Sequence, residues 1–213
     1  GDEDPYPGEK GESPSLMLNF GRKVAKAWFG SEDVRQIEIS DLRMFLDLVR
    51  RQAKDEQNKI WLDYDEAKCL ISVGSLGEAR ALVLPVLRNK QTESWAWGAL
   101  AATYREESTD ATITLYAQGI LSAHEDTFIL PQLAAIAILL AKEGSIEAAS
   151  MCVKRAVDCY EANGWKIKPN IEKLTLEEWY ISDVDMGSID TFLREKAASA
   201  PIYLYNDIRT VSG

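Results

Sequence analysis

The sequence predicts an all-α fold built from stacked antiparallel helical hairpins. Three segments between residues 59 and 164 can be aligned on their central small residues Ala67, Ala101 and Ala137, which lie 34 and 36 residues apart. Apolar residues recur at i, i+3, i+4 and i+7, the spacing of one helix face. No stretch alternates convincingly between apolar and polar residues, so we assign no strand.

Composition excludes several classes of protein. The 213 residues have a net charge of −10 and are 46% hydrophobic, which suits one globular domain, alone or with an appendage. The acid excess argues against a protein coated in phosphate-binding charge. One His and three Cys argue against a His-rich metal site or a disulfide framework, and we expect no metal and no cofactor. The longest apolar run, Leu133–Ala141, falls short of the about 20 residues of a membrane span.

The N-terminal part divides into a tail and a helical region. Residues 1–14 are acidic and rich in Pro, which predicts a flexible tail, and they lack the basic start and apolar stretch of a signal peptide. Residues 15–58 predict helices. The first opens at Ser15 and the second at an N-cap, Ser40. The apolar residues expected near one face of the first helix are Met17, Phe20, Val24, Ala27 and Trp28.

Residues 59–164 predict three hairpins. In the first and third, a Gly follows seven residues after the central Ala (Gly74 and Gly144), and such a Gly can end a helix in a left-handed conformation. The middle segment has no Gly at this place. Residues 165–213 predict an extended connector up to Pro169, a short helix over Leu174–Tyr180, and further capping helices that begin near Ser188 and Pro201.

One stretch of the middle segment resembles a known repeat. Trp97-x2-Leu100-Ala101-x2-Tyr104 is similar to the tetratricopeptide (TPR) pattern W-x2-L-G-x2-Y, with Ala in place of Gly, although the closing Pro of the repeat is missing from all three segments. The resemblance implies a TPR-like α-α superhelix with flanking capping helices. An unrelated α-helical bundle is the alternative.

The resemblance also implies a concave groove that binds a peptide or helix of a partner. The residues at groove positions are Trp61, Tyr64, Lys68, Trp95 and Arg105, whereas Trp97 is expected in the core. The alternative role of these side chains is packing against the helix at 42–54 or against residues 1–14. In the third segment Ala134, Ile138 and Ala141 form an apolar stripe on the same face, which we expect to be covered. The implied function is a non-enzymatic interaction scaffold, and self-association through the groove is a further alternative.

A second resemblance points to a different class of function. The run from Ile60 to Tyr180, with Trp61-Leu-x-Tyr64, Glu93-Ser-Trp-Ala-Trp97 and Asn163-Gly-Trp, is similar to uncharacterised bacterial TPR proteins of predicted conflict systems. This resemblance implies a nucleic-acid-associated accessory module. The cations available for such a role form a candidate basic patch made of Arg22, Lys23, Lys26, Arg50, Arg51 and Lys54. The alternative is the solvated side of two amphipathic helices.

No set of catalytic residues stands out. His124 is the single His, and it lies between two predicted helices, where a nucleophile and an orienting group are not evident. The cysteines, Cys69, Cys152 and Cys159, lack metal-ligand spacing and are expected to be buried thiols, which favours a cytoplasmic protein. The partner, the oligomeric state and the pathway do not follow from the sequence.

Overall fold

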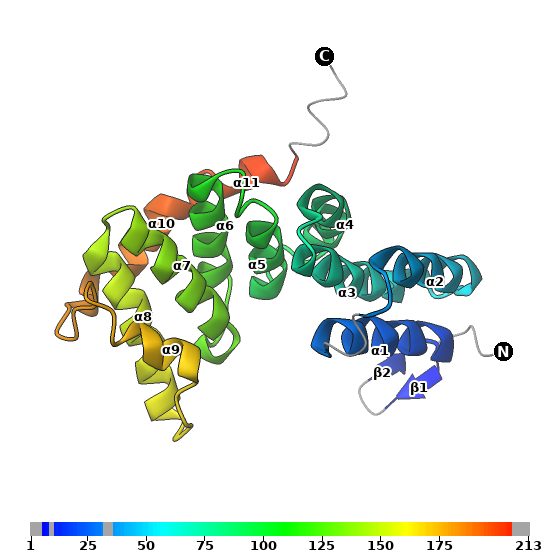
Figure 1. Ribbon diagram of the computed structural model, residues 1–213, viewed down its shortest axis with the longest axis horizontal. Helices are drawn as coiled ribbons and strands as arrows, with labels where there is room; N and C mark the ends of the chain where they lie inside the picture. The colour runs from blue at the N-terminus through cyan, green and yellow to red at the C-terminus, as the bar shows by residue number, and fades with distance from the viewer. Residues whose placement is uncertain (1–5, 9–10, 32–35, 206–213) are drawn as a thin grey trace, which may run out of the picture. The chain divides into compact units, whose positions relative to one another are not determined.

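The described part of the chain is almost entirely helical. The computed structural model describes residues 6–8, 11–31 and 36–205, and its eleven α-helices confirm the predicted all-α class (Figure 1). The chain divides into two compact units, residues 1–89 and 90–213. Each unit is described by itself below.

A short β-hairpin corrects the prediction that the chain has no strand. β1 (Tyr6–Gly8) pairs antiparallel with β2 (Gly11–Ser13), inside the segment predicted as a flexible tail. The rest of that prediction, residues 1–5 and 9–10, lies outside the described residues. Strands of three residues are too short to show an alternating pattern, and the Gly residues beside the turn are its main sequence signal.

The first unit contains four helices, three of which pack around one apolar core. The helices are α1 (Leu16–Gly30), α2 (Ile39–Gln52), α3 (Lys59–Ser72) and α4 (Leu76–Asn89), with a 3-10 turn η2 (Glu56–Asn58) before α3. Both α1 and α2 pack on α3, and α3 forms a hairpin with α4. The core between α1, α2 and α3 consists mainly of Leu18, Ala25, Trp28, Leu42, Leu46, Val49, Leu62 and Cys69.

Two details of the N-terminal helices differ from the prediction. Ser15 caps α1 as expected and accepts the backbone N–H of Leu18 at 3.3 Å. The buried face of α1, however, consists of Leu18, Gly21, Ala25 and Trp28, so the predicted face is rotated and Phe20 is 55% exposed. α1 is apolar around much of its circumference, and periodicity alone could not select the face. Helix α2 begins at Ile39, and its N-cap is Glu38 where Ser40 was predicted.

The second unit contains the other two predicted hairpins and the C-terminal helices. Its first four helices are α5 (Ser94–Ala102), α6 (Thr109–Leu121), α7 (Leu130–Lys142) and α8 (Ile146–Ala162), with η3 (Asp126–Phe128) before α7. They are followed by α9 (Pro169–Leu174), η4 (Met186–Ser188), α10 (Ile189–Ala197) and α11 (Ala200–Tyr203). Helix α10 lies against α6 and α8, whereas α9 lies against α7 and α8.

The three predicted hairpins are confirmed as α3–α4, α5–α6 and α7–α8. Gly74 and Gly144 take positive φ of 80° and 81° as predicted, and the residue after each donates its N–H back to the carbonyl five residues earlier. These bonds are those of a Schellman motif, which ends a helix and satisfies its last carbonyls. The middle hairpin turns without Gly. There, Ser108 caps α6 by accepting the N–H of Ala111 at 3.1 Å.

The C-terminal region differs from the prediction at one helix. Lys168 is extended and Pro169 begins α9, which ends at Leu174, so the short helix predicted over Leu174–Tyr180 is wrong. Pro is favoured at the first position of a helix because its missing N–H has no partner there in any case. The helices predicted near Ser188 and Pro201 are present as α10 and α11.

The three thiols are free and buried, as predicted. Burial raises the pKa of the Cys152 thiol to about 12, although the nearby Arg155 opposes this change. Burial and the negative charge of Asp126 also raise the pKa of Cys159. Only the thiolate is an effective nucleophile, so both groups are poor ones at neutral pH.

We therefore expect native protein to react slowly with Ellman's reagent at pH 8 and all three thiols to react after denaturation. Cys69 and Cys152 are 0% exposed, so they should react only as the units open, whereas Cys159, at 8% exposed, should react first. The measurement is the time course of absorbance at 412 nm, with and without guanidinium. Cys159→Ser is the control and should remove the fastest native phase. Fast reaction of Cys152 in the native protein would contradict the structure.

Candidate functional site

The predicted groove residues of the first unit lie beside α1. The guanidinium carbon of Arg22 stands 5.4 Å from the ring centroid of Trp61, and Lys68 Nζ stands 4.7 Å from that of Phe29. Burial, and then the charge of Asp65, raise the pKa of Tyr64 to about 12. This face of α3 therefore packs against a helix of the same chain. The helix that supplies these two contacts is α1.

Two residues of the candidate basic patch are held in ion pairs with α3. Arg22 Nε donates to Asp65 at 2.8 Å, and Arg50 Nε donates to Asp63 at 2.7 Å. Arg50 also pairs with Glu66. The side chains of Asp65 and Glu66 are each only 3% exposed, so these cations neutralise charges inside the unit.

A residue outside the predicted patch completes this network. Arg43 bridges Glu66 of α3 at 3.2 Å and Glu78 of α4 at 2.9 Å, which raises the pKa of its guanidinium above the usual value. The sequence signal was the spacing of Arg43 and Arg50, which are seven residues apart and share one face of α2. Their carboxylate partners could not be inferred, because they depend on how α2 packs.

The other cations of the patch point into solvent. Lys23, Lys26, Arg51 and Lys54 are exposed. Arg51 Nε donates to the backbone oxygen of Asp47, one turn earlier on α2, at 3.3 Å. The six residues thus divide into two that stabilise the unit and four that are accessible.

The predicted groove residues of the second unit are spread along α5. Trp95, half-buried in the first turn, donates its indole N–H to Glu93 at 3.2 Å. Arg105 follows the end of the helix and lies 3.5 Å from Glu106. A helix rises about 1.5 Å per residue, so the two side chains are separated by most of the length of α5. Trp97 is buried as predicted, and its indole N–H donates to the carbonyl of Gln91 at 2.7 Å.

The apolar stripe predicted on α7 lines a pocket. Ile138, which is 41% exposed, and Ala141 form one wall, and Leu174 and Trp179 form the opposite wall. The pocket has a volume of about 540 Å³. The polar residues at its edge are Lys142, Asn170, Lys173 and Glu177. We call it the α7–α9 pocket. The stripe was predicted to be covered, and Ala134 is buried, but Ile138 is exposed in the pocket. The residues of the opposite wall were not predicted, because the predicted position of α9 was wrong.

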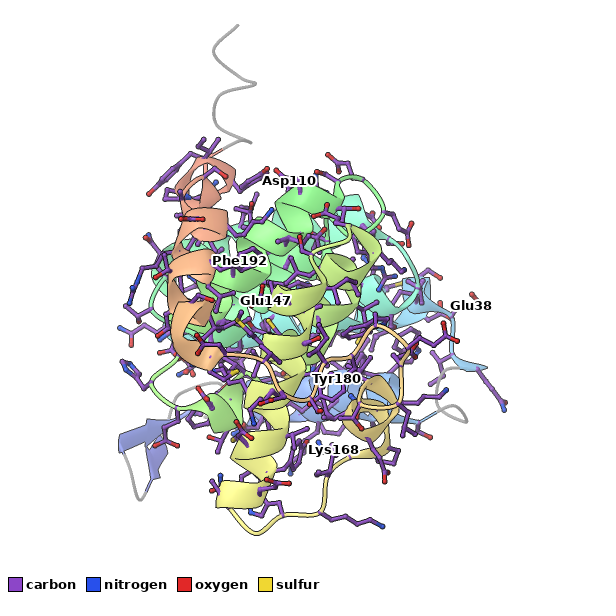
Figure 2. All side chains as sticks on the ribbon, turned by 90° about the vertical axis from the view of Figure 1, so that its left-hand side faces the viewer. Glu38, Asp110, Glu147, Lys168, Tyr180 and Phe192 are labelled. Carbon is purple, nitrogen blue, oxygen red and sulfur yellow. The ribbon has the colours of Figure 1, made fainter. Side chains whose placement is uncertain are left out.

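A second pocket, of about 660 Å³, lies between the start of α8 and α10. Figure 2 shows two of its lining residues, Glu147 and Phe192, on the same side of the second unit. Its lining mixes carboxylates, hydroxyls and apolar groups. No polar side chain in its lining is buried, so this pocket lacks a fixed group that would orient a ligand.

The residues needed for metal or acid–base chemistry are not gathered at either pocket. Within the described ranges, no three His, Cys, Asp or Glu side chains are placed to hold a metal ion. His124 is exposed in the bend after α6. No helix in the described residues is long and apolar enough to cross a membrane.

These features define a class of protein: an all-helical chain of two units built from antiparallel helical hairpins, with further helices before and after them in the sequence and an apolar pocket on the second unit. Residues 60–200 match the family described as "Domain of unknown function (DUF7017)", and the chain belongs to this family. The match covers α3 to the start of α11 and leaves out α1 and α2. No curated protein and no solved structure matches the chain.

Proposed function

We propose that this protein is a non-enzymatic interaction scaffold with TPR-like hairpins, which binds a peptide or helix of a partner protein in the α7–α9 pocket. The main observation behind the proposal is the exposure of Ile138 on the face where the TPR resemblance places the groove. Peptide grooves are apolar clefts in which bulky side chains of the ligand insert. A volume of about 540 Å³ accommodates one or two such side chains.

The charge at the edge of the pocket favours an acidic partner segment. Lys142 and Lys173 are exposed there, against one carboxylate, Glu177. Within the described residues, neither lysine forms an ion pair. Two cations beside an apolar cleft favour a ligand in which acidic residues flank an aromatic or aliphatic side chain.

Other observations favour a cytoplasmic scaffold over a nucleic-acid module and over an enzyme. Free, buried thiols suit a reducing compartment. For a nucleic-acid module, the ion pairs of Arg22 and Arg50 take two cations from the candidate patch, and the net charge of −10 opposes phosphate binding. For an enzyme, the hydroxyls and carboxylates that line the second pocket are not buried, so nothing holds a nucleophile and a base in a fixed arrangement there.

Site-specific photocrosslinking tests the proposal. With p-benzoylphenylalanine at position 138, irradiation of the cells that make the protein should give one discrete adduct with a partner. At position 202, where Ile202 of α11 is also exposed (49%), the same group should give none. Ala141→Arg places a cation in the pocket and should reduce the adduct by about tenfold, a change of about 1.4 kcal/mol. An adduct that forms equally at both positions, or that survives Ala141→Arg, would contradict the proposal.

A further inference from the structure

The first unit has an apolar face that is largely exposed. Leu16 and Phe20 on α1 are 59% and 55% exposed, and Met44 and Leu48 on α2 are 64% and 46% exposed. Phe20 contacts Phe45 edge-to-face, with ring centroids 5.9 Å apart, so the two helices share this surface. We call these five residues the α1–α2 face. It lies outside the part of the chain that matches the family.

The face spans two antiparallel helices. The indole N–H of Trp28, near the end of α1, donates to the carbonyl of Ile37 just before α2. At the other end, Ser15 donates its backbone N–H to Asp55, just after α2. The helices therefore run side by side in opposite directions, and a third helix could pack along the groove between them.

The two helices present the same pattern on this side. In each, two exposed apolar residues four apart are followed three residues later by a cation: Leu16, Phe20 and Lys23 on α1, and Met44, Leu48 and Arg51 on α2. Positions i, i+4 and i+7 share one face of a helix. Two carboxylates lie three residues on either side of Met44, Asp41 and Asp47, and Asp47 is paired with Arg50 at 2.7 Å. The remaining charges, Lys23 and Arg51 against Asp41, are net positive in a chain with a net charge of −10.

We propose that the α1–α2 face is a second docking surface, whose partner is an acidic amphipathic helix of another protein. An apolar stripe of such a helix would cover Phe20 and Leu48, and its acidic residues would lie near Lys23 and Arg51. Exposed apolar surface of this kind on a folded unit is typical of protein interaction sites.

Charge selects this occupant over two others. An anionic bilayer extends under the whole protein, so the net charge of −10 repels it. A single acidic helix interacts only with charges within about one Debye length, and on this face those charges include Lys23 and Arg51. A second copy of the same face would bring two surfaces of the same net positive charge together, because a twofold interface joins like surfaces.

Peptide selection tests this proposal directly. A phage library of random 16-residue peptides would be panned on the full chain, with counter-selection on the double variant Phe20→Gln, Leu48→Gln. Both side chains are exposed, so the variant should keep the wild-type circular dichroism. We expect enriched peptides with apolar residues at i, i+3, i+4 and i+7 flanked by Asp or Glu, and about tenfold weaker binding of their synthetic forms to the variant.

Two further variants and two further measurements separate the alternatives. Lys23→Glu with Arg51→Glu should weaken the peptides further, whereas Ile138→Arg, which alters only the α7–α9 pocket, should leave them bound; the two proposals therefore fail separately. The proposal is overturned if enriched peptides are not acidic or bind the double variant equally. It is also overturned if wild-type protein, but not the variant, sediments with phosphatidylserine vesicles. A dimer in sedimentation velocity that the variant converts to monomer would assign the face to a second copy.

Discussion

Replacing Gly119 by alanine is expected to destabilise the second unit by about 3 kcal/mol, the upper part of the range for overpacking a core. A Cβ atom at this position of α6 would clash with Gln132 Oε1 and would lie 3.1 Å from the carbonyl oxygen of Ser94 and 3.2 Å from Trp97 Cβ. Gln132 cannot move away freely. It is buried, and its Nε2 donates to the Ser94 carbonyl at 2.8 Å.

Hydrogen exchange read by mass spectrometry measures this effect by region. Amides of α5, α6 and α7 should lose protection in the variant, whereas those of α1, α2 and α3 should not change. Gly77→Ala is the matched control, since a Cβ there meets nothing within 4 Å and alanine favours a helix. Gly119→Ala combined with Gln132→Ala should recover part of the loss. If Gly119→Ala were as stable as wild type, the close packing of α5, α6 and α7 would be wrong.

This contact shows where sequence inference ends. The hairpins were predictable because their signals are local: a repeat of about 35 residues, and Gly74 and Gly144 at helix ends. The insertion of Gln132 above Gly98 and Gly119 depends on which helices pack together, and glutamine alone does not indicate a buried position. In the described residues, Gln132 Oε1 is a buried side-chain oxygen without a donor, an arrangement that no sequence pattern predicts.

The candidate sites, like the fold, could be predicted from the sequence only in part. Ile138 and Ala141 were placed on an apolar stripe, because periodicity identifies the faces of a long helix such as α7. The sequence did not predict that Leu174 and Trp179 form the other wall, because α9 begins at Pro169, earlier than the apolar pattern indicated. On α1, apolar residues lie on two faces, and tertiary packing decides which of them is the core face. Phe20 was therefore predicted on the same face as Trp28, whereas Trp28 is buried and Phe20 belongs to the exposed α1–α2 face.

The second large effect is expected in the first unit, where Arg22→Met should cost about 3 kcal/mol. The carboxylate of Asp65 is 3% exposed, and Arg22 is its ion-pair partner at 2.8 Å. Removing one member of a buried pair leaves an uncompensated charge in a poorly solvated place, which typically costs about 3–5 kcal/mol. The lower value is expected because Arg22 itself is 21% exposed and solvent reaches the pair. Loss of the contact with Trp61 adds to the effect.

The neighbouring cation provides the matched control. Lys23→Met removes the same charge one residue later, from an exposed side chain, and should change stability by less than about 0.5 kcal/mol. Arg22→Met with Asp65→Leu should regain most of the loss, because no buried charge then remains unpaired. Urea unfolding measures the free energy of unfolding of each variant, and hydrogen-exchange protection of α1 and α3 shows whether the first unit is the part that is destabilised. If Arg22 stabilises the unit and Lys23 does not, the free energies of unfolding of the two variants should differ by this large amount. If both cations served a basic patch instead, both variants would weaken DNA binding at low salt equally and neither would destabilise the unit.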